Sequence, residues 1–386
     1  MVARKVERGD TEVGCPVRQD ANGVWRVTGY PAGRALLRAA GTVQAGLGIE
    51  TVDKMPSSIR RPVLYRDGPE HREHRRQTAR FFTPRRVDEA YREIMERVAD
   101  AQIARLRAAG SVELADLSFK LAIDVTSAVI GMTESKPGIQ RRLERFFPEK
   151  FGRPGFTSFH GIYWFCRQIA NWSRIYFNDV RPAVKARKAR RRDDLISHLL
   201  DEGCRSTEIL GECLTFAAAG MVTTREFIVL AAWHMFTDDA LRAKYLTSAE
   251  PERVAVLHEI IRLEPVIAQL RRRTTTEIRL PDVDLPKDAL VHIQIDTANL
   301  DPVVVGDQPL DLCPDRTMAD GGASAGLAFG DGHHKCPGSH IAILETDIFL
   351  HKLLAVTGIH MVAPPRVAFK EDIAAYELRG MRVAVE

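Results

Sequence analysis

The segment that most constrains this chain is residues 329–338 (FGDGHHKCPG), in which three glycines and a proline surround Cys336. It directly precedes residues 341–354, whose apolar side chains recur every three or four positions and predict a helix. The pattern therefore predicts a cysteine held in a glycine-rich turn at the start of a helix. Free N–H groups and the positive end of the helix dipole stabilise an anionic sulfur there, so we expect a lowered pKa for Cys336.

Two alternatives for this segment stay open. The first is an ordinary glycine turn with a buried cysteine. The second is a zinc site made by Cys336 with His333, His334 and His340, although their spacing matches no ordinary zinc finger. The other five cysteines are scattered without a CxxC pair, which argues against a disulfide framework or a zinc ribbon.

The rest of the chain is predicted to be mainly helical, with a small β region. The helical spacing of apolar residues covers 87–109, 117–131, 216–236, 254–263 and 341–354, whereas only 24–28 and 290–295 have strand character. Residues 301–327, rich in Asp, Pro and Gly, predict a long irregular connection. With 386 residues, 45% of them hydrophobic, and no repeat or linker, residues 1–386 are predicted to form a single domain.

Charge and hydropathy exclude several classes of partner. The net charge of +4 is small, and the basic run 187–192 lies beside Asp193 and Asp194, so we expect no nucleic-acid partner. The N-terminal residues 1–18 contain no apolar run, and no stretch of membrane-spanning length follows. A cytoplasmic protein without a membrane partner is the expectation.

The cysteine segment resembles the haem-binding loop of the cytochrome P-450 superfamily, Phe-x-x-Gly-x-His/Arg-x-Cys-x-Gly. Every fixed position is filled, by Phe329, Gly332, His334, Cys336 and Gly338. The resemblance implies the family fold, a triangular helical bulk with small sheets. It also implies a bacterial-type soluble haem-thiolate monooxygenase, with haem b as cofactor and the cysteine as axial ligand of its iron. The two glycines would let the flat macrocycle approach the backbone, and the phenylalanine would shield the sulfur from water.

Further segments match the family in order, from about residue 25 to the C-terminus. Glu259 and Arg262 resemble its Glu-x-x-Arg motif, and Arg316 lies in a segment similar to the loop that supplies a second arginine. These three residues would then lock the structure without acting in catalysis. Leu312 stands where the family commonly has Phe, and residues 298–302 are similar to another family segment.

His71 and Arg75 lie one helical turn apart, so two cations on one helix face can bind paired carboxylates. The family uses a matching His-x-x-x-Arg to hold the haem propionates. Arg272 resembles a further propionate arginine. An alternative for the other basic residues of this helix, Arg72 and Arg76, is a solvated basic face.

Residues 216–226 form the most unusual of the predicted helices, because Phe216, Gly220 and Thr223 share one face. The Thr223 hydroxyl can bond the carbonyl of the preceding turn and open the helix, which makes it our candidate for steering protons to oxygen. The stretch resembles the family's oxygen-binding motif, Ala-Gly-x-Asp/Glu-Thr-Thr. That resemblance makes Ala219 and Gly220 contacts of the cofactor, but Val222 stands where the family has its acid.

Glu226 is our hypothesis for the missing acid, since it follows Val222 by four residues. An ordered water or a proton donor on the substrate are alternatives. A further alternative is that Glu226 pairs with Arg225 and takes no part in the chemistry.

The substrate is expected to be small and hydrophobic, and to contact Phe216, Met221, Val222 and Val266. An aromatic cluster in a segment that lines the pocket in the family favours a planar or hydrophobic molecule, although many of its members can simply be core. Its members are Phe146, Phe147, Phe151, Phe156, Phe159, Tyr163, Trp164 and Phe165.

Electrons must come from outside, because the chain has no flavin, nicotinamide or iron–sulfur motif. The expected partner is an acidic ferredoxin with its reductase, which docks on Lys335, Arg80, Arg85 and Arg86. Dioxygen is the expected co-substrate. The alternatives are a peroxide-driven or phenol-coupling enzyme of the same chemistry, and a haem sensor or carrier without catalysis.

Overall fold

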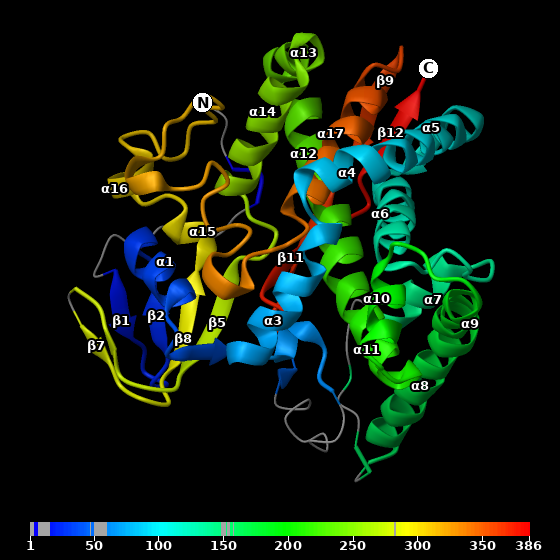
Figure 1. Ribbon diagram of the computed structural model, residues 1–386. Coiled ribbons are helices and arrows are strands. Elements are labelled where there is room, and N and C mark those ends of the chain that lie inside the picture. The colour runs from blue at the N-terminus through cyan, green and yellow to red at the C-terminus, as the bar shows by residue number, and fades with distance from the viewer. Residues whose placement is uncertain are drawn as a thin grey trace.

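The computed structural model describes residues 4–6, 16–46, 48–49, 60–147, 152, 155–156, 158–281 and 283–386. Helices fill most of the molecule, and the largest sheet lies to one side of them (Figure 1). The predicted fold class, mainly α with small sheets, is confirmed.

A continuous helical stretch runs through the helical part, made of α11 (Ser206–Ala217), the π-helical turn η4 (Ala218–Val222) and α12 (Thr223–Thr237). Most side chains of α12 are buried, as expected for a helix that is apolar all round. By length and composition, residues 206–237 could cross a membrane, but 56% of the most apolar window is buried inside the protein. The stretch is therefore a core helix in this fold. The helices packed around α12 are α6 (Leu114–Ile130), α13 (Asp239–Thr247), α14 (Glu250–Leu263) and α17 (Ser339–Leu354).

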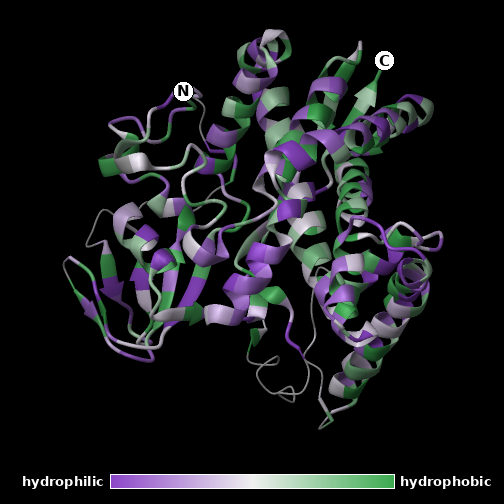
Figure 2. Ribbon diagram, in the orientation of Figure 1, coloured by the Kyte–Doolittle hydropathy of each residue, from purple (hydrophilic) through white to green (hydrophobic). Residues whose placement is uncertain are grey.

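The other helices enclose this core, and Figure 2 shows hydrophilic and hydrophobic residues alternating around most of them. One expectation was wrong: the predicted helix 87–109 is divided at Tyr91, which caps both pieces. The Tyr91 side chain is buried, and the break in the helix does not disturb the apolar spacing. These helices are α1 (Tyr30–Arg38), α3 (Gly68–Thr78), α4 (Pro84–Ala90), α5 (Arg92–Ala109), α7 (Ile139–Phe146), α8 (Phe159–Ile175), α9 (Arg181–Ala189), α10 (Leu195–Asp201), α15 (Ile295–Ala298) and α16 (Pro302–Val305).

The largest sheet has the strand order β1-β2-β8-β5-β3. Its strands are β1 (Val17–Gln19), β2 (Trp25–Val27), β3 (Thr42–Gln44), β5 (Gln269–Thr274) and β8 (Leu290–Gln294). The antiparallel register of β3 and β5 sets Gln44 opposite Arg272. The sheet therefore brings a buried arginine to the edge that faces α3.

Three smaller sheets complete the fold. One has the order β4-β12-β9 and the other two are the hairpins β10-β11 and β6-β7. Their strands are β4 (Ser111–Glu113), β6 (Ile278–Arg279), β7 (Asp284–Leu285), β9 (Ile359–Ala363), β10 (Arg366–Lys370), β11 (Ala375–Arg379) and β12 (Arg382–Val385).

Candidate active site

The cysteine loop is a closed turn at the start of α17. The backbone N–H of Cys336 donates to the carbonyl of Phe329 at 2.8 Å, and Lys335 N–H donates to Gly332 at 3.2 Å. Gly338 is the N-cap of α17, so the cysteine lies two residues before it. The predicted position of a cysteine in a turn that enters a helix is confirmed.

The expected lowering of the thiol pKa is wrong for Cys336. Burial of the sulfur raises its pKa above the ordinary value, although the Gly338 N–H, Arg75 and Lys335 all act in the opposite direction. Desolvation of an anion in a protein interior outweighs one N–H donor and two nearby cations here. A helix start alone therefore does not make this sulfur a thiolate, and a bound metal cation would have to do so.

Gly332 and Gly338 of the loop differ in what surrounds them. Gly332 has φ +64°, and a Cβ there would come within 2.3 Å of the Leu37 carbonyl oxygen at the end of α1. This glycine is therefore required by the close approach of another backbone, not by a macrocycle as the sequence analysis expected. A Cβ at Gly338 would meet nothing within 4 Å, so open space adjoins the residue.

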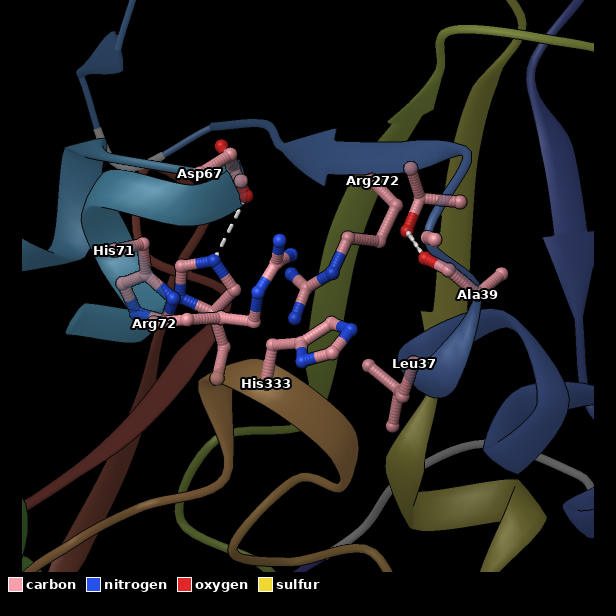
Figure 3. A pocket seen from close by; sticks show the side chains of 11 residues that line it. Leu37, Ala39, Asp67, His71, Arg72, Arg272 and His333 are labelled. Atoms are coloured by element: carbon pink, nitrogen blue, oxygen red, sulfur yellow. Dashed lines mark hydrogen bonds and ion pairs between the residues drawn. The ribbon is translucent and has the colours of Figure 1, made fainter. Parts of the chain in front are cut away.

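A cavity beside the loop is lined largely by cationic and imidazole side chains (Figure 3). His71 of α3 stacks on His334 of the loop, with ring centroids 4.0 Å apart. Asp67, at the start of α3, accepts a hydrogen bond from His334 at 2.8 Å. The described residues that line the cavity are Leu37, Ala39, Ala40, Thr42, Asp67, Gly68, His71, Arg72, Arg272, His333 and His334.

Among the described residues that line this cavity, Asp67 is the one carboxylate, beside the cations Arg72 and Arg272. Burial lowers the pKa of Arg272 to about 10, with only Asp67 acting against it. Burial also lowers the pKa of His71 to about 3, and His334 and Arg75 add to the shift. The pKa of Arg75 is lowered by burial as well, while Cys336 raises it. Carboxylates placed here would therefore be bound by positive charge and by imidazole donors.

Glu259, Arg262 and Arg316 meet as the sequence analysis expected. Arg262 donates from Nε and Nη2 to the two carboxylate oxygens of Glu259, both at 2.7 Å, and Arg316 Nε donates to Oε1 at 2.9 Å. Arg262 and Glu259 are both almost fully buried. Arg316 also donates to the carbonyls of Val305 and Gln308, so the cluster fixes the irregular segment that precedes the cysteine loop.

The helix predicted over residues 216–226 was expected to open near Thr223, and the π-helical turn η4 lies directly before this residue. The Thr223 hydroxyl donates to the carbonyl of Ala219 at 2.6 Å, one turn before it. π-turns within α-helices occur frequently at functional sites. Close packing favours glycine at position 220, because a Cβ there would come within 3.0 Å of Thr126 Oγ1 on α6.

Glu226 is committed to an ion-pair network and is poorly placed to replace the missing acid. Its Oε1 accepts from Arg225 Nε at 2.9 Å, and its Oε2 accepts from Arg379 at 2.7 Å and from the Leu378 N–H at 2.8 Å. The structure therefore favours the alternative in which Glu226 pairs with Arg225. The carboxylate ties α12 to β11.

Comparison with known proteins agrees with this geometry. The sequence profile of the family "Cytochrome P450" matches residues 254–356, which include the Glu259 pair and the cysteine loop. Erythromycin C-12 hydroxylase of Saccharopolyspora erythraea is 28% identical over 365 residues, covering 89% of this chain and 84% of that protein. These matches support the cytochrome P450 superfamily for this chain. It is accordingly an oxidoreductase of the monooxygenase class.

Other cytochromes P450 agree in sequence and in fold. The biotin biosynthesis cytochrome P450 of Bacillus subtilis is 25% identical over 338 residues, covering 86% of this chain and 82% of that protein. The crystal structure of P450BioI in complex with hexadec-9Z-enoic acid ligated acyl carrier protein superimposes with a TM-score of 0.77. It is 20% identical and covers 96% of this chain and 95% of that one, so it confirms the fold alone.

Haem is the cofactor that the cytochrome P450 family implies, and the residues present fit it. The cavity beside the loop offers basic and imidazole side chains for two carboxylates, and Gly338 adjoins open space. Within the described ranges, no group of three or more His, Cys, Asp or Glu side chains could hold a metal ion. The zinc alternative with His333, His334 and His340 is therefore unsupported.

The four expected substrate contacts stay predictions, and they differ in exposure. Met221 and Val266 are 1% and 5% exposed and belong to hydrophobic clusters. Val222 is partly exposed, and Phe216 is partly exposed and stacks on Phe82 with centroids 5.8 Å apart.

The aromatic segment is mostly not core, contrary to one alternative. Phe159 and Phe156 are 94% and 73% exposed, and Tyr163 is also exposed, whereas Phe146 is buried. Phe151 lies outside the described residues. The segment thus presents much apolar surface.

Sequence reasoning did not place Asp67, Arg72 or His333 at the cavity, and it missed Gln44, which contacts two of the lining residues. Gln44 accepts from Arg272 Nη1 at 2.5 Å, and its N–H donates to Asp67 at 3.1 Å. Arg72, for which a solvated face was the alternative, is exposed and also lines the cavity. Only the adjacency of Asp67 and Arg72 to His71 could have suggested them.

Proposed function

We propose that this chain is a haem-thiolate monooxygenase. It holds haem b through the sulfur of Cys336 and uses dioxygen to hydroxylate or oxidatively couple a small hydrophobic substrate. The observation that carries the proposal is the junction of α3 with the cysteine loop, where Arg75 donates to the Lys335 carbonyl at 2.5 Å and His71 stacks on His334. This junction sets carboxylate-binding groups beside a metal-binding sulfur.

Each group of residues has its own part in the proposal. When bound, the haem supplies the iron at which dioxygen is activated, with the sulfur as electron donor. His71, Arg75 and Arg272 would bind its propionates. Thr223 gives its hydroxyl hydrogen to Ala219, so its oxygen is free to accept from a water at the π-turn.

The substrate class follows from the relatives and from the surface near η4. One relative is an erythromycin C-12 hydroxylase, and a similar structure, CYP109E1 from Bacillus megaterium, contains corticosterone. Phe216 and Val222 offer apolar surface beside the turn. A hydrophobic, secondary-metabolite-like molecule suits these groups. Titration of such compounds against the ferric spin state would identify ligands, since a fitting ligand expels water from the iron.

The proposed electron donor is an acidic ferredoxin, supplied with its reductase in the cytoplasm. Lys335 and Arg80 are exposed and form the cationic surface for it. Arg85 and Arg86 are less available, because they pair with Glu89 at 2.8 Å and with Asp193 at 3.0 Å. Reduction by the ferredoxin should slow as salt is raised, and a salt-independent rate would contradict this docking.

A peroxide-driven or phenol-coupling reaction is the second candidate. The observation that favours it is the absence of an acid at Val222, together with the ion pairs that occupy Glu226. Turnover with hydrogen peroxide, but not with ferredoxin and dioxygen, would support this candidate over the first.

The decisive test is the absorption of the reduced carbon monoxide adduct. The wild type should show the red-shifted band that sulfur ligation gives, Cys336→Ser should lose it, and the exposed control Cys313→Ser should keep it. A wild-type adduct without that band, or a Cys336→Ser adduct that retains it, would refute the proposal.

A further inference from the structure

Asp67 is the N-cap residue of α3, but its side chain does not cap this helix. Its Oδ1 accepts from His334 at 2.8 Å and its Oδ2 accepts from the Gln44 N–H at 3.1 Å, so both oxygens are bound elsewhere. An N-cap aspartate ordinarily accepts from N–H groups of its own helix and fixes where the helix begins. The first turn of α3 is therefore placed by other contacts.

Arg66, the residue before Asp67, makes such a contact. Its Nη2 donates to Oε1 of Glu212, which lies on α11. The Glu212 carboxylate also accepts from the Val63 N–H at 3.1 Å. One carboxylate on α11 therefore binds both the start of the short 3₁₀ helix η1 (Val63–Tyr65) and the residue that follows it.

The contact between Arg66 and Glu212 lies in the interior of the protein. The two residues are 4% and 3% exposed, so solvent has little access to either partner. Burial raises the pKa of Glu212, while Arg66, the Val63 N–H and Arg60 act in the opposite direction. η1 contacts both α3 and α11. The donors that join these two helices therefore also stabilise the buried carboxylate.

The two sides of α3 differ in how they are held. One side contacts the cysteine loop through His71, which stacks on His334. The other side carries His74, which is 1% exposed and whose Nε2 lies 4.0 Å from Oε1 of Glu212. Within the part of the chain that the structure describes, neither ring nitrogen of His74 has a hydrogen-bond partner. On this side the directional contact is therefore the one that Arg66 makes.

We propose that Glu212 is a positioning residue for the cofactor site. Through Arg66 it fixes the start of α3, and thereby holds Asp67 and His71 against His334 (Figure 3). This inference rests on the proposed function, in which the adjoining cavity takes the haem propionates. Because α11 continues into η4, the same contact ties the oxygen-binding turn to the propionate site.

Haem transfer to apomyoglobin tests the proposal. Residues that orient the binding groups of a metal site typically change its affinity about 10–100-fold when they are removed, so Glu212→Gln should release haem about tenfold faster than the wild type. The matched control is Asp179→Asn, which removes another buried carboxylate. Asp179 is 1% exposed and binds Arg142 at 2.6 Å, and neither residue lines the cavity.

A general loss of stability is removed from this comparison by the choice of temperature. Each transfer is measured at the same interval below the melting temperature of the variant itself. Asp179→Asn should then release haem at the wild-type rate. Equal rates in Glu212→Gln and Asp179→Asn would overturn the proposal.

A double variant shows whether Glu212 acts through Asp67. Asp67→Ala should also speed haem release, because it removes the acceptor of His334. Residues that act as a unit have non-additive effects. The double variant Glu212→Gln/Asp67→Ala should therefore release haem no faster than the faster of the two single variants. Effects that multiply in the double variant would contradict the proposed route.

Hydrogen exchange of the haem-bound protein gives a readout that does not depend on haem release. The Val63 N–H donates to Glu212, so the peptide that covers residues 63–71 should exchange faster in Glu212→Gln than in the wild type. In Asp179→Asn the same peptide should exchange at the wild-type rate. Unchanged exchange of this peptide in Glu212→Gln would also overturn the proposal.

The two proposals fail in different ways. A wild type without sulfur-ligated absorption overturns the haem-thiolate function. A wild type that has this absorption, but from which Glu212→Gln and Asp179→Asn do not differ in haem release, overturns only the role of Glu212. If Glu212→Gln does not fold, Arg66→Lys takes its place, since lysine keeps the charge but lacks the planar guanidinium donors. Haem release at the wild-type rate in Arg66→Lys has the same consequence.

Discussion

Replacing Glu259 by Gln should cost more stability than any exposed charge substitution in this chain. The carboxylate accepts four hydrogen bonds: two from Arg262 at 2.7 Å, one from Arg316 at 2.9 Å and one from the Cys313 N–H at 3.1 Å. Arg262 is 0% exposed, so no solvent can replace the lost anion. Removing one partner of a buried ion pair typically costs about 3–5 kcal/mol.

This loss is large against a total stability of about 5–15 kcal/mol. Urea unfolding followed by circular dichroism measures it, and the midpoint should fall while the slope stays unchanged. The matched control is Glu89→Gln, which breaks an exposed pair with Arg85 at 2.8 Å and should leave the unfolding midpoint nearly unchanged. Equal midpoints for Glu259→Gln and Glu89→Gln would refute the reasoning.

Three further predictions follow from the site. Arg272→Ala should release haem to apomyoglobin about tenfold faster than the exposed control Arg76→Ala, since a charge-assisted bond is worth about 1.5–3 kcal/mol; equal rates would contradict a propionate contact. Burial raises the pKa of Glu345 in the folded protein to about 8 from an ordinary value of 4.5, so its stability contribution is fully present below pH 4.5 and is lost as pH rises through about 8. Glu345→Gln should therefore melt at a higher temperature than the wild type at pH 8.5, and a lower melting temperature there would contradict the shift. Glu226→Gln should lower the melting temperature because Arg379 loses its buried anion, yet leave unchanged the share of the electrons from ferredoxin that ends in hydrogen peroxide; a raised share would restore Glu226 as a proton donor.

Local patterns in the sequence were sufficient to locate several long helices and one strand. The spacing of apolar residues located α6, α12, α14 and α17, and the alternation at 290–295 located β8. The break at Tyr91 was missed because the helical spacing continues through it. The three-residue strands β1, β3 and β4 are too short to carry a pattern of their own and exist through pairing with distant segments.

The site could be predicted only where a motif lies on one element. His71, Arg75 and Cys336 could be singled out as candidates because helical spacing and a glycine-rich turn are local features. Their partners come from elsewhere in the chain, as Asp67 does for His334 and Gln44 for Arg272. The prediction of a lowered pKa for the Cys336 thiol failed for the same reason, since the burial that dominates this pKa is made by tertiary packing.

The missing acid at Val222 illustrates what sequence spacing cannot decide. Glu226 was the natural candidate because it lies one turn away on the same helix, but β11 supplies Arg379 and the Leu378 N–H, which consume its carboxylate. Glu345 is more than a hundred residues away along the chain, yet the packing of α17 on α12 sets it against Thr224. A free carboxylate is determined by which neighbours leave it unpaired and dry, and both conditions are properties of the packed core.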